Sequence, residues 1–404
     1  MGFIQNINNF RMKRINSILI ITLFVMVGSI GCKQSGTQSD DLVTVDVTAS
    51  YPKKELVLQD CFDIEYVPLE TNDVFVTHGY VRAIGKDVIV IRNYINDGNI
   101  FIFDRKDGKA LKMINHKGNG AVEYINAVDI LLDDDAGEIL VNDGMGGKML
   151  LYDLNGTFIR SFNYENMNRA YRGVNIFDQD NLICFDRQAV FDREEISKQS
   201  FEIISKQDGR VTKEIEFNFD EKKSMFLVVP EVGSAFIDAY PPIIPYLDHF
   251  LLTELSTDTV YRYTRDHQMI PFMTRTPSIQ TMVDPEVYVF PTIITDRYYF
   301  MIKVDKVWDF VLNEGFPVTN LMYDIDKKAI FECHAYNSDF TDKRPIELRY
   351  KFAHEDVAFW QILEAHELVE AYEEGKLKGK LKEIVATLDE ESNPVIMLAK
   401  HKKQ

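Results

Sequence analysis

Short apolar runs alternate with polar breaks along most of the chain, and these runs combine into a repeated unit. Each unit begins with an apolar strand and a polar break. A second apolar strand follows, which ends in an aromatic–Asp pair or its equivalent, and a turn then leads to a third strand. The clearest copies occupy residues 88–114 and 139–162. Weaker copies occupy residues 182–209, 250–263 and 298–331, so the pattern predicts at least five similar β-sheet units.

The spacing of the unit indicates which β-rich fold it forms. Equivalent turn positions fall at residues 104, 153, 205, 264 and 324, so the unit recurs every 49 to 60 residues. A four-stranded blade of a β-propeller takes roughly 40 to 50 residues. Asp-Gly or Asn-Gly pairs at 107–108, 155–156 and 208–209 favour tight hairpin turns. A β-sandwich with irregular strands is the alternative, but it would not explain the near-constant interval.

Further apolar segments lie on both sides of the five copies, at residues 42–47, 64–69 and 394–399. A propeller loses its exposed sheet edge when its first and last strands pair. We therefore expect residues 42–404 to form an all-β, six-bladed β-propeller, with a sixth blade built from both ends and a C-terminal closing strand. Helical spacing of apolar residues within 354–389 predicts a short C-terminal helical pair packed on the ring.

The first 31 residues have the layout of a secretory signal peptide. Lys13 and Arg14 precede an apolar run at residues 15–27, which is shorter than the roughly 20 residues of a membrane span. Small residues then lead to Cys32. We interpret residues 1–11 as an upstream extension, Cys32 as a lipidated N-terminus and residues 32–41 as a polar tether. The alternative is an uncleaved N-terminal anchor in which Cys32 has no role.

Charge and cysteine content narrow the possible partners. The chain has 63 acidic and 45 basic residues, a net charge of -18, which argues against nucleic acid or an anionic membrane surface as a partner of the folded part. Three cysteines remain after Cys32, namely Cys61, Cys184 and Cys333, so at least one is free. Cys184 and Cys333 lie in strand-like runs, and we expect them to be buried.

Four segments carry a resemblance to a known family. They are the lipobox-like residues 28–32 and residues 61–71, 256–263 and 392–398. Together they resemble the six-bladed β-propeller lipoproteins of Bacteroides-type bacteria, which are similar in fold to NHL and TolB-like propellers. Residues 118–124 keep the Gly-x-Gly and Glu-Tyr of a loop typical of that family, while Ala121 and Val122 replace its Pro and Gly. The resemblance implies a fold and a lipid anchor, and no established activity.

No catalytic motif is readable in the sequence, so binding is the leading hypothesis. A nucleophile elbow, a phosphate loop followed by a helix and a Cys-x-x-Cys pair are all missing from it. We expect no catalytic residue, no metal-binding residue and no cofactor. The chain is then a non-catalytic binding or scaffold module for an envelope protein, a peptide or a glycan. We expect it at the outer membrane, facing the periplasm and attached only through its N-terminal lipid.

Candidate binding residues are the aromatics of two long insertions, residues 219–248 and 277–296. Tyr240, Tyr246, Tyr288 and Phe290 would provide a large contact area with few rotamers. Alternatively, such aromatics plug the channel or cover blade edges. The alternative function is a metal-dependent propeller enzyme, lactonase- or lyase-like, with a divalent cation such as calcium in the central channel. Its candidate ligands are Asn96, Asp97, Asn126, Asp129, Asn142 and Asp143.

Overall fold

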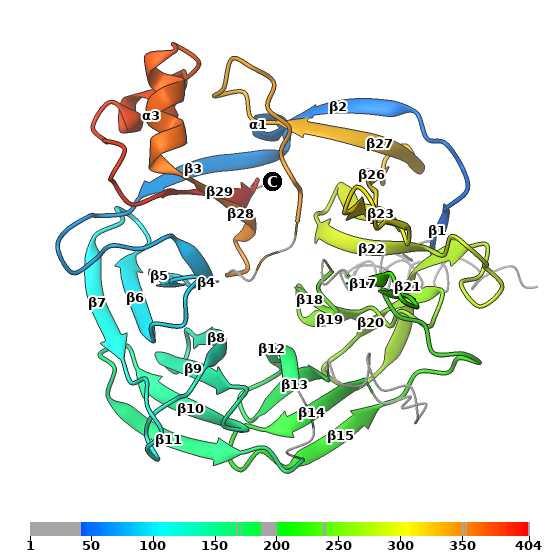
Figure 1. The fold of residues 1–404 in the computed structure, drawn as a ribbon, viewed down its shortest axis with the longest axis horizontal. Coiled ribbons are helices and arrows are strands. Elements are labelled where there is room, and N and C mark those ends of the chain that lie inside the picture. The colour runs from blue at the N-terminus through cyan, green and yellow to red at the C-terminus, as the bar shows by residue number, and fades with distance from the viewer. Residues whose placement is uncertain are drawn as a thin grey trace, which may run out of the picture. The chain divides into compact units, whose positions relative to one another are not determined.

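Six β-sheets form a closed ring (Figure 1). The computed structural model describes residues 42–402 except 167–168, 170, 187–199, 237–239, 350 and 352–353. The predicted leader, Cys32 and the tether lie outside the described residues. The predicted six-bladed propeller is confirmed, and the sandwich alternative is wrong.

The first three blades each consist of four consecutive antiparallel strands, with the first strand innermost. Blade 1 contains β4 (Tyr80–Ile84), β5 (Val88–Arg92), β6 (Asn99–Asp104) and β7 (Ala110–Asn115). Blade 2 contains β8 (Ala127–Asp133), β9 (Glu138–Asp143), β10 (Lys148–Asp153) and β11 (Phe158–Asn163). Blade 3 contains β12 (Tyr171–Ile176), β13 (Asn181–Asp186), β14 (Phe201–Ser205) and β15 (Val211–Ile215).

The other three blades each take their outermost strand from the N-terminal part of the chain. Blade 4 contains β18 (Ile243–Tyr246), β19 (His249–Leu252), β20 (Thr259–Tyr263), β21 (Met269–Thr276) and β1 (Val43–Asp46), which runs parallel to β21. Blade 5 contains β22 (Val287–Ile294), β23 (Tyr298–Asp305), β26 (Val318–Asp324), β27 (Ala329–Tyr336) and β2 (Lys53–Val57), which runs parallel to β27. Blade 6 contains β28 (Val357–Leu363), β29 (Val395–His401) and β3 (Phe62–Pro68), which follows the one-turn helix α1 (Leu58–Cys61).

Blade 6 closes the ring because β29 lies between β28 and β3 and is antiparallel to both. The sixth blade therefore does combine both ends of the chain. Two details of the prediction are wrong. Residues 42–47 belong to blade 4, because β1 extends that sheet in parallel. Residues 357–363 are a strand, because β28 is buried along most of its length and its apolar run therefore carries no clear period.

The predicted C-terminal helical pair is present, shortened to α3 (Ala365–Glu373) and α4 (Gly379–Val385). Leu368 of α3 and Leu381 of α4 are buried in one cluster with Phe62 of β3. The helices thus share the core of blade 6, at the outer side of the ring (Figure 1). Within the described residues, none of the helices combines the length and the apolar character needed to cross a membrane.

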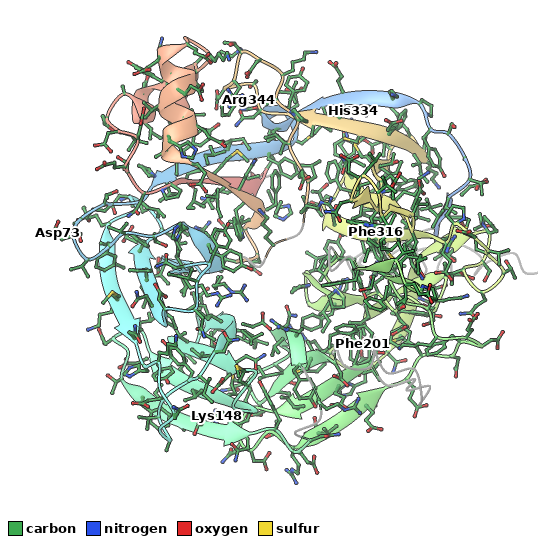
Figure 2. All side chains as sticks on the ribbon, viewed as in Figure 1. Asp73, Lys148, Phe201, Phe316, His334 and Arg344 are labelled. Atoms are coloured by element: carbon green, nitrogen blue, oxygen red, sulfur yellow. The ribbon has the colours of Figure 1, made fainter. Side chains whose placement is uncertain are left out.

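Side chains fill the spaces between neighbouring sheets (Figure 2), and the buried ones form apolar clusters. Each pair of adjacent blades shares one buried cluster; between blades 1 and 2, for example, Val90 and Ile102 pack with Ile130 and Val141. Cys184 and Cys333 are buried in β13 and β27, as expected, and Cys61 is half-buried; all three are free thiols. Burial raises the pKa of Cys333 to about 12, so this thiol is not a reactive nucleophile.

Two small hairpins stand outside the blades. The first, β16 (Phe226–Val229) and β17 (Gly233–Phe236), lies between blades 3 and 4 in the chain. The second, β24 (Trp308–Asp309) and β25 (Glu314–Gly315), is inserted between β23 and β26 of blade 5. Each hairpin is a separate two-stranded sheet.

Candidate functional site

A pocket of about 620 Å³ opens at the centre of the ring, where the innermost strands of five blades face one another. We call it the channel pocket. Its walls come from β4, β8, β12, β22 and β28, together with segments that connect the blades. Its polar and aromatic lining residues are Tyr80, Arg82, Tyr94, Asp129, Tyr240, Thr292, Glu347, Arg349, Lys351 and Trp360.

Three cationic side chains line the pocket and come from distant parts of the chain. Arg82 belongs to β4, whereas Arg349 and Lys351 belong to the segment that leads into β28. The guanidinium of Arg82 lies 2.7 Å from the carboxylate of Asp129 and donates to the hydroxyl of Tyr80 at 3.0 Å. In this ion pair the positive charge of Arg82 and the negative charge of Asp129 neutralise each other.

The positive charges of Arg349 and Lys351 are less completely neutralised by neighbouring carboxylates. Arg349 Nε lies 3.7 Å from the carboxylate of Glu347, whose side chain is 77% exposed, so water screens this pair strongly. Lys351 Nζ lies 4.4 Å from the centre of the Trp360 ring, a cation–π contact. Burial lowers the pKa of Lys351, and the nearby Glu347 opposes that shift. With three cations against two carboxylates, the pocket is locally positive in a chain of net charge -18.

Several buried polar atoms of the pocket have no hydrogen-bond partner among the described residues. They are Arg349 Nη1, Arg82 Nε, the second carboxylate oxygen of Asp129 and the hydroxyl of Thr292. Thr292 lies in β22 and is only 1% exposed. A buried polar group without a partner costs roughly 1–3 kcal/mol, so such groups are ordinarily paired. These atoms retain hydrogen-bonding capacity that the described residues leave unused.

Aromatic rings form the rest of the wall. Tyr80 and Tyr94 are stacked with their ring centres 4.8 Å apart, and Tyr94 is largely exposed. Tyr240 lines the pocket and stacks on Phe290 at 4.4 Å. Such surfaces suit a flat or ring-shaped group, which can stack on an aromatic face.

The predicted binding aromatics have different environments. Tyr240 is half-buried in the channel pocket, which it reaches from the predicted insertion 219–248. Tyr246 is half-buried in β18 and packs edge-on against His249 at 5.1 Å. Tyr288 and Phe290 lie in β22 and are buried. The expectation that all four lie in loops is therefore wrong, because residues 287–294 form the inner strand of blade 5. Tyr288 and Phe290 are buried in a cluster that also contains residues of the two small hairpins.

The predicted metal ligands do not converge either. Asp143 is fully buried and accepts hydrogen bonds from the backbone N–H groups of Ile125, Asn126 and Gly146 at 3.0–3.1 Å. Asn142 donates to the backbone carbonyl of Tyr171. Asn96 donates to the backbone carbonyl of Ile125, and Asp97 accepts from the backbone N–H of Asn99. Of the predicted ligands, only Asp129 lines the channel pocket. The part of the chain that the structure describes contains no group of three or more His, Cys, Asp or Glu side chains suited to a metal ion.

Sequence reasoning missed Arg82, Thr292, Arg349 and Lys351. No motif marks them, because they come together only when the ring closes. Arg82 and Thr292 lie on innermost strands, whereas Arg349 and Lys351 lie on the segment that leads into β28. Arg82 had the one usable signal: it precedes the first apolar run of a blade, where an innermost strand is expected.

The unpaired hydroxyl of Thr292 leads to a stability prediction. In Thr292→Val the hydroxyl is replaced by a methyl group of similar size, so we expect the free energy of unfolding to change by less than about 0.5 kcal/mol, or to rise. The matched control is Thr77→Val. The Thr77 hydroxyl donates to Asn93 Oδ1 at 3.0 Å and accepts from the Gly79 N–H at 3.1 Å, so its loss costs about 2 kcal/mol. Urea denaturation measures both; a loss of 1 kcal/mol or more in Thr292→Val, on the order of one hydrogen bond, would show that its hydroxyl is structural.

Comparison with known proteins identifies the fold and the family. A protein of Bacteroides fragilis that is named as an exported protein has a similar structure, with a TM-score of 0.63 and 16% identity over 90% of this chain and 100% of that one. A member of the DUF4221 family from Bacteroides vulgatus reaches a TM-score of 0.41 at 12% identity, over 85% of this chain and 98% of that one. Virginiamycin B lyase of Staphylococcus aureus reaches 0.36 at 14% identity, over 64% and 74% of the two chains.

The search of curated proteins finds no match. The predicted resemblance to Bacteroides propellers is confirmed in its fold. Residues 42–400, which include all six blades, match the model of a domain of unknown function, DUF4934, and the chain therefore belongs to the DUF4934 family.

Proposed function

We propose that this protein is an exported binding module whose channel pocket holds a ligand that carries a carboxylate next to a ring. The acidic end of a glycan or of a peptide has this chemistry. The observation that carries the proposal is the locally positive pocket in a strongly acidic chain, with a buried and unpaired Arg349 Nη1. A carboxylate there would gain the donor that the described residues leave unpaired.

Geometry and size support this ligand class. A guanidinium presents donors in a planar fork that matches a carboxylate, and Lys351 adds a second positive charge nearby. The rings of Tyr80, Tyr94 and Tyr240 offer stacking surfaces on the other walls. The volume of about 620 Å³ falls in the range of roughly 300–1,000 Å³ typical of small-molecule pockets.

The lining favours binding over turnover. The described lining residues include no Ser, Cys or His, which are the most common side-chain nucleophiles and general bases. The carboxylate of Asp129 is already engaged by the guanidinium of Arg82 at 2.7 Å. The metal-dependent alternative has no comparable support in the channel pocket.

A ligand panel tests the proposal. Galacturonate is compared with galactose, and a tripeptide with a free C-terminus is compared with its amide. We expect at least one acidic compound to raise the melting temperature while its neutral counterpart does not. Arg349→Met should weaken that binding at least tenfold, about 1.4 kcal/mol. Arg297→Met, at an exposed position away from the channel pocket, is the matched control.

Equal shifts with acidic and neutral compounds, or unchanged affinity in Arg349→Met, would refute this ligand class. Chemical conversion of a bound compound, followed by mass spectrometry, would replace the binding role with the enzymatic alternative.

We also propose that Cys32 becomes a lipidated N-terminus and holds the propeller at the bacterial envelope, at the outer membrane and facing the periplasm. The leader layout of residues 12–32 supports this, as does the structural similarity to an exported Bacteroides protein. The polar residues 33–41 would then act as a tether.

Detergent partitioning of the protein made in its own host tests the anchor. The wild type should enter the detergent phase, and Cys32→Ala should move to the aqueous phase or accumulate as uncleaved precursor. Cys61→Ala, a change at a half-buried cysteine of the propeller, is the control and should partition like the wild type. Identical partitioning of Cys32→Ala and wild type would contradict lipidation.

A further inference from the structure

The two hairpins outside the blades form one surface. Ala235 of β17 and Phe316, directly after β25, are buried in the same cluster, and Trp308 and Phe310 pack against it. The position that a Cβ atom would take at Gly233 lies 3.3 Å from ring carbons of Phe310, so the hairpins are in direct contact. Phe316, labelled in Figure 2, lies on the blade 5 side of the ring. We call the exposed part of these hairpins the hairpin surface.

The hairpin surface is apolar at the positions most exposed to water. Val311 is 93% exposed, Leu312 67%, Val232 62% and Phe236 54%. Val228, Val229 and Val307 are exposed beside them. Turns of this kind are ordinarily polar, and soluble proteins rarely expose large contiguous apolar patches unless the patch binds something.

Local hydrogen bonds hold the most exposed residues outward. The carboxylate of Asp309 accepts hydrogen bonds from the backbone N–H groups of Val311 at 2.8 Å and of Leu312 at 3.0 Å. Asn313 closes the turn with a positive φ of 54°. The two apolar side chains are thus presented on an ordered turn, which lowers the entropy lost on binding.

The exposed charged side chains around this apolar centre are all negative. Glu231, Asp309 and Glu314 are exposed at the hairpin ends. The lysines among described residues 221–236 and 305–318 are Lys222, Lys223 and Lys306, and their side chains are at most 13% exposed. Each pairs with a glutamate: Lys222 with Glu254 at 3.4 Å, Lys223 with Glu221 at 2.8 Å and Lys306 with Glu286 at 2.8 Å. The rim therefore presents carboxylates and no exposed lysine.

We infer that the hairpin surface docks a protein partner whose contact face has an apolar centre and a rim of lysine or arginine. Apolar contact supplies the affinity, and opposite charges at the rim supply orientation and association rate. A second copy of this chain would place carboxylates against carboxylates, and an anionic bilayer would repel the same rim. Both therefore fit the surface less well than a basic partner does. This site is separate from the channel pocket and does not depend on the ligand proposed there.

Two defined peptides test this inference with the full mature chain. They share one leucine face and differ only in having lysine or glutamate at every polar position. We expect the lysine peptide to bind at least tenfold more tightly and to slow amide hydrogen exchange in residues 226–236 and 308–315. Because the acidic chain attracts any cationic peptide, the location of this protection is the decisive readout.

Paired variants separate the hairpin surface from general charge attraction. Val311→Ser with Leu312→Ser leaves the net charge unchanged and should weaken lysine-peptide binding at least tenfold. Leu111→Ser with Ile159→Ser removes exposed apolar residues from the outer strands β7 and β11 and should leave binding unchanged. Circular dichroism checks that both double variants stay folded. The hydrogen-exchange measurement on the wild type locates the binding site even if a variant does not fold.

Three results would overturn the inference. The first is equal affinity for both peptides, or protection that lies outside the two hairpins. The second is binding to phosphatidylglycerol vesicles that is lost in the Val311→Ser, Leu312→Ser protein, which would assign the surface to a membrane. The third is a dimer in sedimentation experiments that the same pair of changes dissociates, which would assign the surface to a second copy.

Discussion

The pairing of β29 with both β28 and β3 holds the ring closed, and the rest of the structure depends on it. Seven consecutive residues of β29 pair with β3, which joins strands more than 300 residues apart in the chain. The buried Asn393 reinforces this joint: its side chain accepts from the Thr77 N–H at 2.9 Å and donates to the carbonyls of Glu70 and Phe75 at 2.8 Å. Without this joint, blades 1 and 6 would each lose a neighbour and expose the apolar cluster between them.

Closure also decides where recognition can take place. The N-terminal strands β1, β2 and β3 cover the outer edges of blades 4, 5 and 6, where an open strand would invite association with other chains. The innermost strands are held in register by their blades, so Tyr80, Arg82 and Trp360 of the channel pocket are positioned by rigid elements. Arg349 and Lys351 reach the pocket from the segment that connects blades 5 and 6. The two hairpins lie outside this framework and present apolar side chains without disturbing it.

The repeated hairpins were predictable because their signal is local, whereas the site was not. Gly108, Gly156 and Gly209 have the positive φ that the Asp-Gly and Asn-Gly pairs predicted. The parallel pairing of β1 with β21 of blade 4 leaves no local signal in the sequence, because no hairpin turn joins these two strands. The run that includes β28 looked helical because a strand buried along most of its length shows no alternation. Arg82 and Arg349 meet in the channel only through closure, and a single sequence carries no trace of such a meeting.

Native-state hydrogen exchange of β29 and β3 tests the closure claim most directly. If the joint forms part of the cooperative core, the amides of these strands exchange only through global unfolding. Their protection, and its dependence on denaturant, then equals that of β10 in the middle of blade 2. If β29 and β3 instead exchange faster than β10 through an opening that hardly depends on denaturant, the ends fray independently and the ring does not depend on their pairing.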